Sequence, residues 1–415
     1  MNRLLSFALF SVAAVGTTVS AQQKFTLTGR IDGLQTGDTL RFERVIHPDW
    51  EREFAFDVVV GQPGTFQYRG KQEHDQHYLM TYLPKEGKAP RCDRSGKEVI
   101  VTGGDRIRFS GTADEIYYCA LGGGIYDDPL LAETLRLEDS LGMIRGSYAR
   151  EIEAAYARKD TAGARKYTQL FNNFGRSGSD PGFDRVREAR KAYAEAHPDG
   201  TLYLLIQNIP SIAYKPIGES KAAYAAYSPE LKAGYYGRLY AETLAGMERL
   251  ADGQPAPDFS VVTVAGETAT KKDYQGGYLL IYHWGLCPGS IYIDGQVREL
   301  YDKYKDKGLE GIGLTESVAT IRQVYEGLPK DEKTPSAGVE DMRPVLAGML
   351  EHPWTEVEVE TDHPDNRSLM DAYKFSGWPF FVLIGPDGKI EARGFTDAFF
   401  KARTLLDEKL GAPAE

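Results

Sequence analysis

The segment that most restricts the fold of this chain is a short apolar run that leads through a cysteine into a helix. The run covers residues 278–282 and is typical of a buried strand, whereas residues 290–307 repeat apolar side chains at helical spacing. Cys287 therefore lies where a strand gives way to a helix. The first backbone N–H groups of a helix have no partner within it, and together with the helix dipole they stabilise a thiolate. This position predicts a reactive cysteine.

Strands and helices alternate from this region to the end of the chain. A cluster of Pro and Gly at 251–257 is typical of a linker and marks where the alternation begins. Apolar runs at 309–314 and 380–384 predict further strands, and residues 399–410 have the pattern of an amphipathic helix. Such alternation predicts an α/β sheet with helices on both faces.

The region before residue 251 changes character along its length. Residues 22–115 contain short alternating strands separated by Gly and Pro turns, which predicts a β-sandwich-like domain. Residues 116–250 are rich in charged and Ala-containing stretches that predict a helical middle segment. We therefore expect a β-rich domain (22–115), a helical segment (116–250) and an α/β domain (251–415).

The first residues predict a secretion signal. Met-Asn-Arg precedes an apolar run at 4–15, and small residues up to Ala21 suit a cleavage site. A run of about 12 apolar residues is too short to span a bilayer, so an N-terminal membrane anchor is the weaker alternative. We expect removal of residues 1–21 and a mature protein in the periplasm with no transmembrane span.

Charge and cysteine content narrow the classes of partner. The chain has 49 basic and 60 acidic residues, a net charge of −11, which argues against nucleic acid and anionic lipid as partners. Three cysteines are too few for a disulfide scaffold. In an exported protein Cys92 and Cys119 could form one structural disulfide, although sequence cannot place their Cα atoms. The spacing of His74 and His77 lacks further ligands, so we expect no metal site and no cofactor.

Four motifs in order resemble the thioredoxin-like proteins of the TlpA/ResA type, which are related to the AhpC/TSA peroxiredoxins. They are GQPAPDF at 253–259, the strand and turn at 278–290, GWP and its strand at 377–384, and PDGKI at 386–390. The resemblance implies a thioredoxin fold for 251–415 and a cis peptide bond before Pro379, with this proline packed against the reactive sulfur. The region before it resembles the N-terminal extension of exported Bacteroidetes thioredoxin-like proteins.

The active-site motif departs from the family's Cys-x-x-Cys. Here it consists of Cys287, Pro288, Gly289 and Ser290, so a serine replaces the resolving cysteine. A lone cysteine attacks a disulfide but cannot release itself by forming an internal one. A second thiol, from the substrate or from outside, must resolve the mixed disulfide. The motif favours monothiol exchange or isomerisation over net dithiol reduction.

Three residues near the motif allow two interpretations each. Trp284 and Trp378 are either core aromatic residues or the lining of a peptide groove. His283 is either an ordinary strand residue or a group that tunes the thiol.

Two functions remain open at this point. The first is an exported thiol-disulfide oxidoreductase or isomerase that acts through Cys287 on protein or small-molecule thiols and disulfides. The second is a redox-inactive binding module in the periplasm, in which Cys287 is an inert thiol as most free cysteines are. The sequence does not indicate an oligomeric state.

Overall fold

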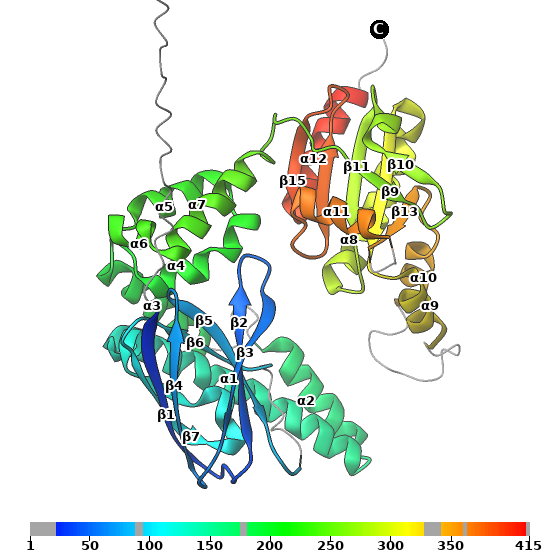
Figure 1. The fold of residues 1–415 in the computed structure, drawn as a ribbon. Helices are drawn as coiled ribbons and strands as arrows, with labels where there is room; N and C mark the ends of the chain where they lie inside the picture. Colours follow the sequence, from blue (N-terminus) through cyan, green and yellow to red (C-terminus); the bar gives the residue numbers. More distant parts are fainter. Residues whose placement is uncertain (1–21, 88–93, 175–180, 328–341, 360–362, 412–415) are drawn as a thin grey trace, which may run out of the picture. The chain divides into compact units, whose positions relative to one another are not determined.

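A computed structural model describes residues 22–87, 94–174, 181–327, 342–359 and 363–411 (Figure 1). By their contacts the residues divide into two compact units. The first unit runs to His197 without residues 47–50, and the second contains residues 47–50 and everything from Pro198 onward. The division falls within the segment 116–250 that we expected to be helical. The boundary at 250 follows the end of a helix at Glu248. The boundary at 115 falls inside a 3₁₀ helix, and a last strand of the first sheet, Ala120–Gly122, still follows it. As domain boundaries both stay predictions.

Two four-stranded sheets form the start of the first unit and confirm its β-rich character. Their strand orders are β4-β1-β7-β8 and β3-β2-β5-β6. The strands are β1 Gln23–Asp32, β2 Thr39–Ile46, β3 Glu51–Val59, β4 Thr65–Gln72, β5 Gln76–Leu83, β6 Lys97–Val101, β7 Arg106–Thr112 and β8 Ala120–Gly122. Phe42 of one sheet contacts Phe109 of the other, with 6.3 Å between ring centroids. Such contacts between the inner faces make a sandwich.

The helical segment follows in two parts. In the first unit, Asp128 caps α1 by accepting hydrogen bonds from the N–H groups of Leu130 and Leu131, as a helix start requires. The helices of this unit are α1 Pro129–Ala157, α2 Thr161–Asn173 and α3 Pro181–Ala196. The second unit contains α4 Leu202–Asn208, α5 Ile217–Ala226, α6 Pro229–Ala233 and α7 Tyr235–Glu248. Short 3₁₀ helices are η1 Ala113–Tyr118, η2 Gly124–Asp127, η3 Pro210–Ala213, η4 Lys271–Tyr274 and η5 Lys305–Lys307.

A five-stranded mixed sheet organises the rest of the second unit, in the order β13-β12-β11-β14-β15. Its strands are β11 Tyr278–His283, β12 Leu309–Thr315, β13 Thr355–Glu358, β14 Phe380–Ile384 and β15 Ile390–Gly394, and a small hairpin joins β9 Ser260–Val262 to β10 Thr268–Thr270. The central strand β11 runs parallel to β12 and antiparallel to β14. This is the predicted α/β sheet.

Helices cover both faces of this sheet. They are α8 Pro288–Tyr304, α9 Val318–Gly327, α10 Met342–Met349, α11 Pro364–Tyr373 and α12 Thr396–Leu410. Alternate residues of β14 face opposite ways. Phe381 packs in one core with side chains of α8 and α12. Phe380 contacts Phe375, just after α11, on the other face. The buried apolar side chains on each face hold the central strand rigidly, and β11 leads directly to the candidate site.

Candidate active site

Cys287 is the residue that caps α8. The strand β11 ends at His283, and the helix begins at Pro288. The Cys287 sulfur accepts a hydrogen bond from the Ser290 N–H at 3.3 Å, which is one of the N–H groups without a partner inside the helix. Cys287 is half-buried and Pro288 is exposed. The sulfur therefore has a backbone donor and belongs to a residue that is only partly buried.

The Ser290 hydroxyl lies beside the sulfur, where the family has a second thiol. Its Oγ is 3.3 Å from the Cys287 Sγ, and it accepts a hydrogen bond from the Gly285 N–H at 3.3 Å. In this arrangement the Cys287 thiol donates to the Ser290 oxygen. A hydroxyl is both donor and acceptor, so when Cys287 is a thiolate the same group can donate to the sulfur instead. Ser290 is fully buried. The serine therefore binds the Cys287 sulfur, but its hydroxyl cannot attack a mixed disulfide as a second thiolate would.

The peptide bond between Trp378 and Pro379 is cis, as the resemblance implied. The Trp378 carbonyl oxygen is 3.6 Å from the Cys287 sulfur. A Cβ atom added to Gly289 would lie 2.8 Å from Cδ of Pro379, so the absence of a side chain at Gly289 lets this proline pack against the first turn of α8. The structure thus joins the motif to a segment about 90 residues later.

His283 connects the end of β11 to the same segment. Its Nδ1–H donates to the Gly377 carbonyl at 3.0 Å, and its Nε2 accepts from the Trp378 indole N–H at 2.8 Å. The ring is buried, and burial lowers the pKa of His283 to about 4. A neutral imidazole has one donor and one acceptor nitrogen, which matches these two bonds. The polar contacts of the ring are with Gly377 and Trp378 and not with the Cys287 sulfur, so they match neither interpretation fully and show a strand residue that holds Trp378.

We expect His283 to make stability depend on pH. The folded-state pKa of about 4 lies below the ordinary histidine value of 6.5, so the unfolded chain binds a proton first as the pH falls. Neutral His283 therefore contributes its full share to the free energy of unfolding above pH 6.5. This contribution falls by about 3 kcal/mol as the pH drops toward 4. Denaturant unfolding of the wild type and of His283→Phe between pH 4 and 7.5 measures it. The difference between the two proteins should shrink by about that amount toward pH 4, and a constant difference would contradict the assignment.

A buried network of charged groups lies below the motif, and the sequence analysis missed it. His352 contacts Asp294 of α8 through Nε2 at 2.7 Å and Glu356 of β13 through Nδ1 at 2.6 Å. Arg298 donates to the second oxygen of Asp294 at 2.9 Å. The Trp284 indole N–H donates to Glu356 at 3.1 Å, which connects the network to the residue three before Cys287. Trp284 is 1 % exposed and therefore belongs to the core.

The protonation of this network follows from its contacts. Burial by itself would lower the pKa of His352, but the hydrogen bonds and charges of Asp294 and Glu356 outweigh it and raise the pKa. Burial raises the pKa of Glu356, against the opposing effect of His352. Both imidazole nitrogens face carboxylates, so His352 is an imidazolium that donates twice. Together with Arg298 it balances the two carboxylates in the core.

One part of this network was visible in the sequence. Asp294 stands three residues before Val297 and seven before Tyr301, on the apolar face of the predicted helix. An acidic residue at a core position requires a partner, because burial of an unpaired charge is costly. The sequence around His352 and Glu356 gives no such indication, because these residues lie about 60 positions after Asp294 in the chain.

The predicted disulfide stays untested. Cys92 lies outside the described residues, so its predicted pairing with Cys119 remains a prediction. Cys119 is 2 % exposed, and burial raises the pKa of its thiol to about 11. The described residues contain no group of three His, Cys, Asp or Glu side chains that could hold a metal ion.

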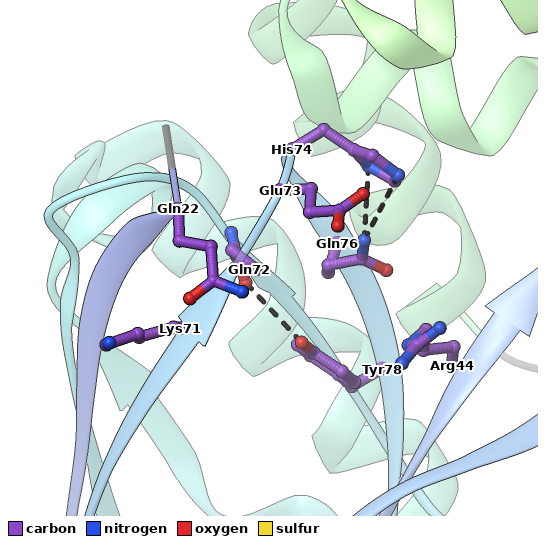
Figure 2. Close-up of a pocket in the computed structure, with 8 residues that line it drawn as sticks. All are labelled: Gln22, Arg44, Lys71, Gln72, Glu73, His74, Gln76 and Tyr78. Atoms are coloured by element: carbon purple, nitrogen blue, oxygen red, sulfur yellow. Dashed lines mark hydrogen bonds between the residues drawn. The ribbon is translucent and has the colours of Figure 1, made fainter. Parts of the chain in front are cut away.

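Two cavities lie away from Cys287. One, of about 270 Å³, is in the β-rich domain, and Figure 2 shows that polar side chains from β2, β4, β5 and the β4–β5 turn surround it. Its lining is Gln22, Arg44, Lys71, Gln72, Glu73, His74, Gln76 and Tyr78. The Tyr78 hydroxyl donates to Gln72 at 3.4 Å across this lining. The other, of about 230 Å³, lies by Leu279 and Ile384, at the opposite end of β11 and β14 from the motif.

Comparison with known proteins finds relatives for part of the chain. No protein-family model matches it. The thiol-disulfide oxidoreductases ResA of Bacillus thuringiensis (strain Al Hakam) and of Bacillus anthracis are each 35% identical over 77 residues. The match covers 18% of this chain and 44% of each relative, so it spans less than half of their length.

Solved structures align with a similar share of the chain. The thioredoxin domain of a thiol-disulfide oxidoreductase from Bacteroides vulgatus is 21% identical, covers 39% of this chain and 99% of that chain, and has a TM-score of 0.27. A thiol:disulfide interchange protein from Bacteroides sp. is 21% identical, covers 40% and 94% of the two chains, and has a TM-score of 0.29.

Proposed function

We propose that this chain, whose C-terminal domain is thioredoxin-like and related to the ResA-type thiol-disulfide oxidoreductases, is an exported enzyme that exchanges disulfides through Cys287 alone. One observation carries the proposal. The sulfur of the half-buried Cys287 lies 3.3 Å from both the N–H and the hydroxyl of Ser290, beside cis-Pro379. Donors placed in this way stabilise a thiolate, which is the form that attacks disulfides.

The reaction consists of two exchanges. The Cys287 thiolate attacks one sulfur of a substrate disulfide, a Cys287–substrate disulfide forms, and the other substrate sulfur leaves as a thiolate. A second thiolate, from the same substrate or from a small thiol, then attacks the mixed disulfide and releases Cys287. If the attacking group belongs to the same substrate, no net oxidation occurs and the disulfides are rearranged. This outcome suits a chain with serine at position 290.

The location of the enzyme is part of the proposal. Residues 1–21, the predicted secretion signal, lie outside the described residues, and we propose that they direct the chain to the periplasm. In the part of the chain that the structure describes, no helix is long and apolar enough to cross a membrane. The proposed substrates are protein or small-molecule thiols and disulfides. Nucleic acid is not a proposed partner.

Replacement of Cys287 by alanine should reduce disulfide exchange to the uncatalysed rate, because the reacting sulfur is gone. The assay is rearrangement of a scrambled protein in a glutathione buffer, with the wild type and a Cys119→Ala variant as matched controls. Cys119 is buried, so we expect its variant to keep the activity. Exchange that survives in Cys287→Ala, or that fails equally in the wild type, would contradict the proposal.

A redox-inactive binding module is the second candidate, and the serine at position 290 favours it. In this case the wild type would show no exchange, while capture of a periplasmic partner would survive in Cys287→Ala. The two candidates therefore predict opposite results in the same pair of proteins.

A further inference from the structure

Two contacts fix the indole of Trp378, and a third places the backbone of the same residue beside Cys287. Its N–H donates to Nε2 of His283 at 2.8 Å. A Cβ atom added to Gly285 would lie 2.7 to 3.0 Å from the Trp378 ring atoms, so the indole lies directly against the backbone two residues before Cys287. The carbonyl of Trp378 is 3.6 Å from the Cys287 sulfur. Trp378 is half-buried, so the indole is neither a fully packed core side chain nor a freely exposed one.

His283 is held as firmly as the indole that it binds. Its other nitrogen donates to the Gly377 carbonyl at 3.0 Å. Its ring contacts Phe375 edge-on, with 5.5 Å between centroids. Because β11 is the central strand of the sheet, His283 is a rigid point of attachment. One imidazole thus fixes both the backbone and the side chain of the segment before Pro379.

We propose that His283 is a positioning residue that holds the Trp378 indole as a fixed wall beside Cys287, and that this wall selects substrates by size. In its fixed position the ring covers the backbone before the cysteine and leaves one side of the sulfur open. Small or extended disulfides reach the sulfur from that side. Bulky reagents reach it only when the indole moves, and movement requires the bond to His283 to break.

The charges around His283 do not compete with this role. The described polar contacts of its ring are the Gly377 carbonyl and the Trp378 indole, both uncharged. The aromatic rings packed on it are Trp378 and Phe375. The charged groups near the motif, Asp294, His352 and Glu356, gather around Trp284 instead. Substitution at His283 therefore changes the indole without removing a charge from that network.

The test compares how fast two reagents label Cys287. The full-length protein is treated at pH 7 with iodoacetamide, which is small, and with fluorescein maleimide, which is bulky, and labelling of the Cys287 peptide is followed by mass spectrometry. In His283→Phe the labelling rate with fluorescein maleimide, divided by that with iodoacetamide, should rise about 2- to 10-fold. Loss of one ordinary hydrogen bond increases the population of the displaced indole by about this factor. Trp378→Phe, which removes the indole N–H, should raise the ratio as well. His283→Gln, which keeps a donor and an acceptor, should restore part of the wild-type ratio.

Two further measurements separate positioning from general loosening. In the double variant His283→Phe/Trp378→Phe the effects should not add, because both substitutions break the same bond. The indole N–H signal of Trp378 in NMR should be protected from exchange in the wild type and lose protection in His283→Phe. His363→Phe, a change at an exposed histidine, is the control and should leave the ratio unchanged.

The role of His283 rests on the proposed function only because the Cys287 sulfur is taken as the reacting atom. If Cys287 is labelled by neither reagent, the proposed function fails. If Cys287 is labelled but the ratio is the same in folded His283→Phe and Trp378→Phe, the wall is refuted while the proposed function stands. Additive effects in the double variant would refute it too. Should His283→Phe fail to fold, Trp378→Phe gives the ratio alone.

Discussion

Substitution of Ser290 by cysteine should turn the proposed monothiol site into a dithiol reductase. The serine oxygen is already 3.3 Å from the Cys287 sulfur, so a thiol at this position needs only a small shift to form a disulfide. Resolution of the mixed disulfide then becomes intramolecular, at an effective concentration of about 1 mM or more. With dithiothreitol at about 0.1 mM, we therefore expect insulin reduction to rise about tenfold or more over the wild type.

Two controls define this result. Ser290→Ala lacks both the hydroxyl and a second thiol, and it should show no gain. Ser290→Cys in a Cys287→Ala background has a thiol at the second position only, and it should remain inactive because position 290 is fully buried. If mass spectrometry shows a 287–290 disulfide but turnover equals that of the wild type, resolution by an outside thiol does not limit the natural protein.

The second large effect should come from the buried network. Substitution of His352 by leucine leaves Asp294 and Glu356 without the cation between them. Removal of one partner from a buried charged group costs about 3 to 5 kcal/mol of unfolding free energy. Asp294 retains Arg298, and Glu356 retains the indole donors of Trp284 and Trp354. We expect urea unfolding at pH 6 to show a loss in this range.

The pH dependence identifies the charge as the cause. The pKa of His352 is raised, so its stabilisation is complete below the unfolded pKa of about 6.5 and is lost as pH rises through the folded pKa. The difference in unfolding free energy between the wild type and His352→Leu should therefore become smaller at alkaline pH. His363→Leu, at an exposed position, is the matched control and should change stability by less than about 0.5 kcal/mol. A difference in unfolding free energy that does not vary with pH would mean that His352→Leu removes packing contacts and not a charge interaction.

Local pattern was sufficient for the parts of the site that are adjacent in sequence. The apolar run before Cys287 and the helical spacing after it predicted the strand and the helix that meet there, and the structure has β11 and α8 at these places. The helix begins at Pro288, two residues earlier than predicted, because proline fits the first turn of a helix. The cis bond at Pro379 was predicted from family resemblance, since an ordinary X-Pro bond is cis only about 5% of the time.

The parts that were missed depend on contacts between distant segments. Nothing beside His352 in the sequence shows that Asp294 and Glu356 surround it. His283 had two interpretations because its partners, Gly377 and Trp378, come about 95 residues later. The polar cavity of the β-rich domain likewise combines β2 with β4 and β5. Spacing along one element carries information about that element, whereas these groups are brought together by contacts between strands, helices and loops that are distant in sequence.

The antiparallel pairing of β11 with β14 has a consequence for how this domain can vary. His283 at the end of one strand lies opposite Phe380 at the start of the other, so the sheet itself holds Cys287 near Pro379. The length of the connection between these strands does not enter that geometry. A doubling of a loop's length costs only about 0.6 kcal/mol. Insertions between these two strands can therefore accumulate and give relatives of this chain new surfaces around an unchanged arrangement of Cys287 and Pro379.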